Sequence, residues 1–145
     1  VENRGTAVRL HLQNPLSPLL DPGFVESTVR LHFEPLFDRY FDGILGQHYP
    51  AGVRFALNGR DLDRHDRIGG EQAPVSVRLV RKRKPAAVGL LVREASPLPP
   101  DRRGIAISTY GKVIKRGWDW LGLSPGNADL VSGLIEAPAA TWNGS

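Results

Sequence analysis

The 145-residue chain contains neither cysteine nor methionine. Without cysteine it cannot form disulfide bonds or thiolate metal sites. No apolar run approaches the ~20 residues that a membrane-spanning helix needs, and the opening "VENRGTAVRL" has no signal-peptide pattern. We therefore expect a cytoplasmic protein that does not contact a membrane. Because methionine is missing even at position 1, we infer that the chain is a piece of a longer protein.

The residues that are present favour a folded, moderately basic domain. Hydrophobic residues make up 41% of the chain, which is enough for a buried core. The 19 basic residues exceed the 15 acidic ones and give a net charge of +4. Such a balance permits binding to nucleic acid, nucleotide phosphate or an acidic partner.

The first part of the chain predicts a strand followed by a helix. Residues 5–12 alternate between apolar and polar positions, which is the period of a half-buried strand. Asp21 followed by Pro22 is typical of a helix start. Apolar residues at helical spacing then predict an amphipathic helix over 22–41, which Pro35 should break near Glu34. We expect its apolar face to cover a sheet.

The rest of the chain predicts strands joined by hairpins. Asn58-Gly59 indicates a tight turn within residues 52–62, and residues 63–74 read as a polar loop. Further strands are predicted by the alternation and turn signals at 75–82, 85–94, 105–110, 112–115 and 132–138. The predicted fold is α+β, with a mostly antiparallel sheet covered on one face by helix.

No catalytic or metal-binding constellation is evident. The four histidines (His11, His32, His48 and His65) form no H-x-H or H-E-x-x-H pattern. There is no G-x-S-x-G elbow for a nucleophilic serine and no G-x-x-x-x-G-K-[ST] phosphate loop. The carboxylates near residue 61 alternate with arginines, which favours a solvated charged loop.

Two basic segments are candidate ligand sites. The run Arg81-Lys82-Arg83-Lys84 is interpreted as a solvated hairpin tip, with phosphate contact as the alternative. The second segment, "YGKVIKRGWDW", begins at Tyr110. Gly111 should allow a turn there, with Lys112 at its tip and Lys115 and Arg116 following. We expect one of Trp118 and Trp120 to lie in the core and the other to form a lid or interface.

Four segments, in order, resemble the GHKL ATPase superfamily, which includes the ninety-kilodalton heat-shock chaperones, MutL, gyrase B and MORC proteins. "RGTAVRLHL" (4–12) is similar to the last strand of their ATP-binding domain, and "VRFALNGRDL" (53–62) to a hairpin of MutL-type transducer domains. "GIAISTYGKVIKRGWDW" (104–120) and "VSGLIEAP" (131–138) resemble a MORC pattern, "NRLIKPFW" followed by "GVLE". The positions that carry this last match are Lys112, Ile114, Lys115, Trp118, Gly133, Ile135 and Glu136.

The resemblance implies that residues 1–20 end an ATP-binding domain and its linker, and that residues 21–145 form a transducer domain. The implied fold is similar to a domain of a small-subunit ribosomal protein. The full-length protein would be an ATPase of the heat-shock-chaperone or MORC type that uses ATP and Mg²⁺, bound mainly by the missing upstream domain. The implied partners are that domain and a second subunit of a homodimer. This fragment would hold no cofactor and no catalytic residue.

The resemblance also implies that a transducer lysine senses the ATP γ-phosphate. In MORC-like members it lies in a stretch like "THNKQ", whereas "ATWNGS" (140–145) has no lysine here. We therefore assign that role to no residue, and treat Lys112, Lys115 and Arg116 as interdomain or phosphate-facing candidates. An autonomous RNA- or DNA-binding module that uses residues 81–84 remains the alternative.

Overall fold

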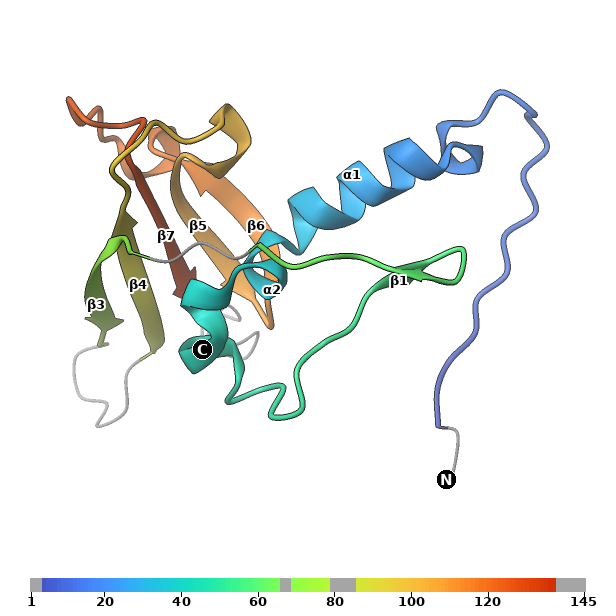
Figure 1. Cartoon of the computed structure of the whole chain (residues 1–145), viewed down its shortest axis with the longest axis horizontal. Coiled ribbons are helices and arrows are strands. Elements are labelled where there is room, and N and C mark those ends of the chain that lie inside the picture. Colours follow the sequence, from blue (N-terminus) through green and yellow to red (C-terminus); the bar gives the residue numbers. More distant parts are fainter. Residues whose placement is uncertain (1–3, 66–68, 79–85, 138–145) are drawn as a thin grey trace.

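A computed structural model of the chain describes residues 4–65, 69–78 and 86–137. It confirms the α+β fold: a five-stranded sheet has a short helical layer on one face (Figure 1). A helix projects away from the sheet together with an extended segment, residues 5–12, which we call the arm. The helical elements are the 3₁₀ turn η1 (Pro18–Leu20), α1 (Pro22–His32), α2 (Glu34–Phe37), η2 (Arg39–Phe41), α3 (Asp42–Leu45), η3 (Pro100–Arg102) and η4 (Asp119–Leu121). The strands are β1 (Ala56–Leu57), β2 (Arg60–Asp61), β3 (Glu71–Val77), β4 (Ala87–Arg93), β5 (Gly104–Thr109), β6 (Lys112–Gly117) and β7 (Val131–Glu136).

The main sheet has the strand order β3-β4-β7-β5-β6. Three of its four pairings are antiparallel, in agreement with the predicted mostly antiparallel sheet, and β5 pairs with β7 in parallel. Strand β7, which is last among the described strands, thus lies at the centre between β4 and β5. Four of the six residues of β7 are buried, and Val131 and Ile135 are half-buried.

The core lies between the sheet and the short helical layer. The buried cluster joins Phe41 and Leu45 of η2 and α3 to one apolar side chain from each of the three central strands: Val92, Ala106 and Leu134. We call this side of the sheet the inner face. The outer face is the opposite one, to which alternate residues of each strand belong.

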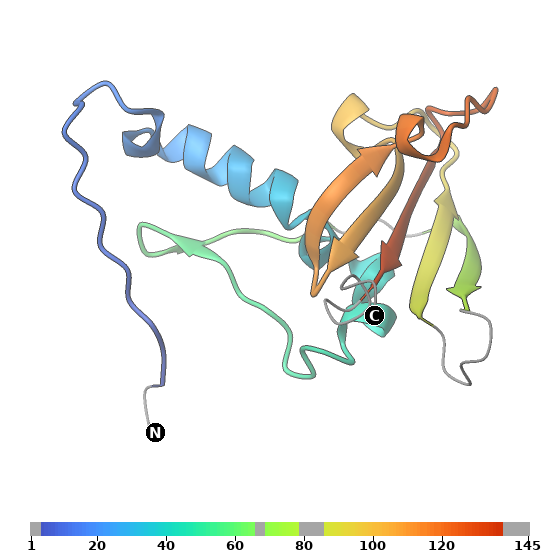
Figure 2. The same ribbon diagram turned by 180° about the vertical axis from the view of Figure 1, so that it is seen from behind.

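The helix signals are confirmed in position but not in role. The Asp21 carboxylate accepts from the backbone N–H of Gly23 and caps α1, which ends at His32, before the predicted break. However, α1 has no buried residue, and Phe24 and Leu31 are 44% and 47% exposed. The prediction that the whole helix covers the sheet is therefore wrong. The end of α1 contacts β6, as α2 does, whereas the rest of α1 projects beyond the sheet (Figure 2).

The predicted strand at 5–12 is absent. Residues 5–12 run extended but pair with no other described segment, and they lie far from the sheet (Figure 2). Val8 and Leu10 are 81% and 71% exposed. The alternating pattern supplies two faces but no partner strand, and a strand forms only when its backbone groups are paired.

Two hairpin regions differ from expectation in extent. Asn58 and Gly59 have φ angles of 51° and 79°, which confirms the turn, although each flanking strand is two residues long. Strand β3 begins at Glu71, inside the predicted polar loop, and runs through Pro74. Proline is tolerated there because β3 is an edge strand. The remainder of the strand predicted at 75–82 lies outside the described residues.

Candidate functional site

The turn between β5 and β6 is built from Tyr110 and Gly111. Their φ angles are 52° and 83°, the signs that a two-residue turn between twisted strands requires. Lys112 was expected at the tip of this turn but is instead the first residue of β6. Gly111 allows the turn, as predicted, and Tyr110 also has a positive φ although it is not a glycine.

A buried carboxylate on β7 accepts hydrogen bonds from the backbone of this turn. The side chain of Glu136 on β7 is 1% exposed and accepts three hydrogen bonds. The donors are the Ser108 hydroxyl at 3.0 Å and the backbone N–H groups of Tyr110 at 2.9 Å and Gly111 at 2.7 Å. Because the donors converge on one side chain, the end of β7 fixes where the β5–β6 turn lies.

The helical side of the molecule contacts the same turn. The Tyr49 hydroxyl, in the segment after α3, donates to the Tyr110 carbonyl at 2.9 Å. The ring of His48 meets that of Tyr110 edge-on, with centroids 4.7 Å apart, and its Nε2 lies 4.0 Å from Glu136 Oε2. A Cβ atom at Gly111 would lie 2.7 Å from Leu36 Cγ. A shift of the helical layer would therefore displace the turn.

The three basic candidates on β6 have different environments. Lys112 and Lys115 are exposed and have no ion pair or hydrogen bond within the described residues. Arg116 is 12% exposed, and its Nη2 donates to Glu34 Oε2 of α2 at 2.6 Å. Its Nε is buried without a partner among the described residues. Arg116 thus joins β6 to α2, whereas the two lysines face solvent. The candidates Arg81, Lys82, Arg83 and Lys84 lie outside the described residues.

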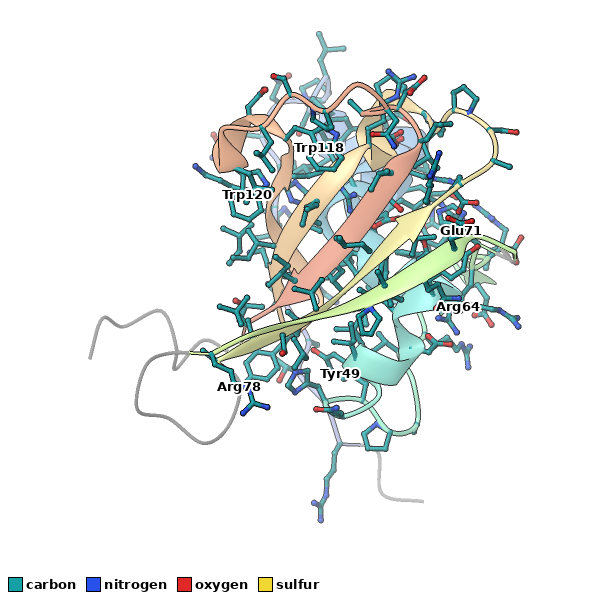
Figure 3. All side chains as sticks on the ribbon, turned by 90° about the vertical axis from the view of Figure 1, so that its left-hand side faces the viewer. Tyr49, Arg64, Glu71, Arg78, Trp118 and Trp120 are labelled. Carbon is teal, nitrogen blue, oxygen red and sulfur yellow. The ribbon has the colours of Figure 1, made fainter. Side chains whose placement is uncertain are left out.

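Both tryptophans after β6 are half-buried, and neither belongs to the buried core. The Trp118 indole N–H donates to the Ala128 carbonyl at 3.1 Å, and that of Trp120 donates to the Ile105 carbonyl at 2.9 Å. The expectation of one core and one lid residue is therefore wrong. The Trp118 bond lies within the segment between β6 and β7, and the Trp120 bond anchors that segment to β5 (Figure 3 labels both).

A cleft of about 480 Å³ opens beside the helical layer. Leu36, Leu45 and Tyr49 form part of its wall, together with Arg54 and Arg64. Both arginines already pair with carboxylates: Arg54 Nε lies 2.9 Å from Asp61, and Arg64 binds Asp42. An anion entering the cleft would have to compete with these pairs.

The charged side chains around β2 form exposed ion pairs, as expected for a solvated loop. Glu26 of α1 accepts from Arg30 at 3.1 Å and from Arg60 at 2.8 Å, which ties the β1–β2 hairpin to the helix. The guanidinium of Arg30, followed by that of Arg60, holds the pKa of the Glu26 carboxyl below its ordinary value. Exposed pairs of this kind orient surface segments more than they stabilise the fold.

Sequence reasoning identified the hairpin but not its internal support. In the sequence, only the family resemblance marks Glu136, and no pattern marks Tyr49. An acidic residue inside the apolar run "GLIEAP" is a signal of a buried, hydrogen-bonded carboxylate. No comparable signal marks Tyr49, because its contact joins segments 61 residues apart.

The described part of the chain contains no cluster of three or more histidine, aspartate or glutamate side chains able to hold a metal ion. No described helix has the length and apolar character to cross a bilayer. Searches against family models, curated proteins and solved structures found no match to this chain.

Proposed function

We propose that this chain is the transducer region of a GHKL-type ATPase, of the heat-shock-chaperone or MORC kind. In this role it couples ATP binding and hydrolysis in an upstream domain to a change of conformation. Three further statements belong to the same proposal. The fold is similar to a domain of a small-subunit ribosomal protein, and the ATP-binding domain with its linker ends at about residue 20. The full-length protein uses ATP and Mg²⁺.

The observation that carries the proposal is the unpaired segment at residues 5–12. Its alternation is typical of a half-buried strand, yet Val8 and Leu10 are exposed and no described segment pairs with it. An apolar strand without a partner is an aggregation hazard that proteins avoid. A sheet in another domain, of which this segment is the last strand, would satisfy both its backbone and its apolar side chains.

The contacts of the hairpin support a coupling role. Helix α1 connects the arm to α2, and Glu34 of α2 binds Arg116 of β6. The far end of the hairpin is held by Tyr49 and Glu136. A movement of the arm would thus reach edge strand β6 through the contact between half-buried Arg116 and buried Glu34.

The proposal assigns no ATP ligand among the described residues. The arginines of the 480 Å³ cleft are paired with carboxylates. In the proposal, the upstream domain supplies the nucleotide chemistry and this chain supplies the moving element.

The first test uses the longer reading frame. We expect it to encode, within about two hundred residues upstream, a helix with an asparagine and a D-x-G-x-G-like segment. The expressed full-length protein should hydrolyse ATP in the presence of Mg²⁺. An upstream region without these features would contradict the proposal.

The second test is hydrogen exchange at residues 5–12. We expect their amides to be protected in the full-length protein and to exchange freely in the 145-residue chain. The double variant Val8→Glu/Leu10→Glu should remove this protection and reduce ATP turnover. Leu16→Glu is the matched control, because Leu16 is 86% exposed and lies after the alternating segment. Equal exchange in the two proteins would show that the arm is not a strand of another domain.

The alternative function is autonomous binding of RNA or DNA. It is favoured by the exposed, unpaired Lys112 and Lys115 on one hairpin and by the net charge of +4. Titration with single- and double-stranded oligonucleotides at ~50 mM salt tests it, because phosphate contacts are strongest at low salt. The absence of binding there would remove this alternative.

A further inference from the structure

The outer face of the main sheet carries two apolar rows that cross its strands. In one row Val75, Gly89, Ile135 and Ile107 are successive partners on β3, β4, β7 and β5. In the next row the successive partners are Ala73, Leu91, Gly133 and Ile105. Directly paired residues project from the same side of a sheet. The outer face therefore has an aliphatic centre that spans four strands.

Glycines keep this centre flat. A Cβ atom at Gly133 would lie 2.7 Å from Leu91 Cδ2, and one at Gly89 would lie 3.2 Å from Ile135 Cγ1. The larger side chains therefore lie over the glycines of the neighbouring strands. Leu91 and Ile135 are half-buried in this way; Ile107 is also half-buried, and Ile105 is buried. Figure 3 looks onto this face, and no described α-helix lies in front of it.

Basic residues border the aliphatic centre. Lys115 is the partner of Ile107 and Lys112 that of Thr109, so both lysines project from the outer face at the β6 edge. Arg93, exposed at the other end, pairs in register with Glu71. The border thus carries more positive than negative charge, and neither lysine has an ion partner within the described residues.

We propose that the outer face binds an amphipathic α-helix of a partner protein whose apolar stripe is flanked by aspartate or glutamate. A strand of six residues is about 20 Å long, which matches a helix of about 14 residues. The stripe would pack on the aliphatic rows, and the acidic flank would meet Lys112 and Lys115. This completes the helix–sheet–helix layering that an apolar sheet face favours.

The other candidate occupants fit less well. A second copy would bring its own net positive border against this one. Single-stranded nucleic acid stacks on aromatic side chains, whereas the centre of this face is aliphatic. A lipid surface is bound by side chains that protrude, and here the central side chains lie flat over glycines. The proposal depends on neither the ATPase assignment nor the arm.

The test uses two helical peptides of about 14 residues, each cross-linked internally to hold the helix. Both carry the same leucine stripe; one has glutamates beside it, and the other has lysines at the same positions. Binding to the 145-residue chain is measured by fluorescence anisotropy at ~50 mM and ~300 mM salt. The bound face is mapped from amide NMR shifts.

We expect the glutamate peptide to bind about tenfold more tightly than the lysine peptide at low salt, with less preference at high salt. The shifts should map to Val75, Leu91, Ile107 and Ile135. Lys115→Glu should reverse the preference, whereas the control Arg9→Glu, on the exposed arm, should not. Ile107→Thr, which keeps the β-branched shape, should weaken both peptides without unfolding the chain.

Equal binding of the two peptides, no binding at about 1 mM, or shifts that map elsewhere would overturn the proposal. So would an oligonucleotide or a phosphatidylglycerol vesicle that occupied the face in preference to the glutamate peptide. The last measurement is sedimentation analysis. A dimer whose interface maps to these rows would identify a second copy as the occupant. The urea midpoint of each variant separates lost binding from lost folding.

Discussion

Replacing Glu136 with glutamine tests whether its charge holds the β5–β6 turn. Glutamine has the same shape as glutamate but exposes an acceptor at one end only. The Ser108 hydroxyl and the Gly111 N–H both donate to Oε1, whereas the Tyr110 N–H donates to Oε2. With the amide oxygen at the Oε1 position, two of these bonds are kept and the amide nitrogen faces the Tyr110 N–H.

The cost follows from the bonds that change. One hydrogen bond to a charged group is lost and a donor is left without an acceptor, which costs about 2 kcal/mol. The two remaining bonds no longer involve a charge, which weakens each by about 0.5 kcal/mol. We therefore expect Glu136→Gln to lower the free energy of unfolding by about 3 kcal/mol. For a chain of this size, that corresponds to a fall in Tm of about 8 °C.

Urea denaturation followed by circular dichroism measures this difference, provided that the slope with denaturant is unchanged. Ser108→Ala is the matched control, because it removes one of the three bonds and keeps the carboxylate. We expect it to cost about 1 kcal/mol. If Glu136→Gln costs no more than Ser108→Ala, the charge of Glu136 does not hold the turn and the reasoning is refuted.

Three further predictions concern the same framework. Gly111→Ala should destabilise the chain by about 2 kcal/mol or more, and Gly122→Ala by about 1 kcal/mol. Both glycines have positive φ, but of the two only Gly111 lacks room for a Cβ atom. Equal losses in Tm would contradict this. Arg116→Met should cost about 2 kcal/mol by removing the charged hydrogen bond that buried Glu34 accepts from Arg116, and Glu34→Met in the same chain should recover part of that loss. The lowered pKa of Glu26 predicts stability that is present above its ordinary pKa and lost as the pH falls through the lowered value. An NMR titration of its carboxyl that gave the ordinary value would refute the last prediction.

The sequence predicts the fold wherever the signal is local. The Asp21 cap, the break near Glu34 and the turns at Asn58-Gly59 and Gly111 all depend on a few neighbouring residues, and all are confirmed in position. The central strands are also found, because their apolar runs are bounded by turn residues. The parallel pairing of β5 with β7 is not predicted, since strand β6 and a loop separate the two strands in the chain.

The wrong predictions, by contrast, concern features that depend on contacts with distant segments. At residues 5–12 and in α1 the amphipathic pattern is present, and the structure leaves its apolar side exposed. Periodicity records that a segment has an apolar face, but not which surface covers that face. The pattern therefore predicts a partner without placing it, and here no described segment supplies one.

The candidate site likewise has one part that the sequence predicts and one part that it does not. The hairpin and its exposed lysines follow from the sequence, whereas the support from Glu136, Tyr49 and Arg116 depends on contacts between distant segments. These contacts separate the basic residues by role: Arg116 faces inward to α2, and the lysines face outward at the edge of an aliphatic surface. One strand, β6, thus connects the helical layer on the inner face to a basic border on the outer face. A partner bound to the outer face would contact β6, the same strand that Glu34 binds through Arg116. The two proposals therefore involve one strand, although separate experiments test them.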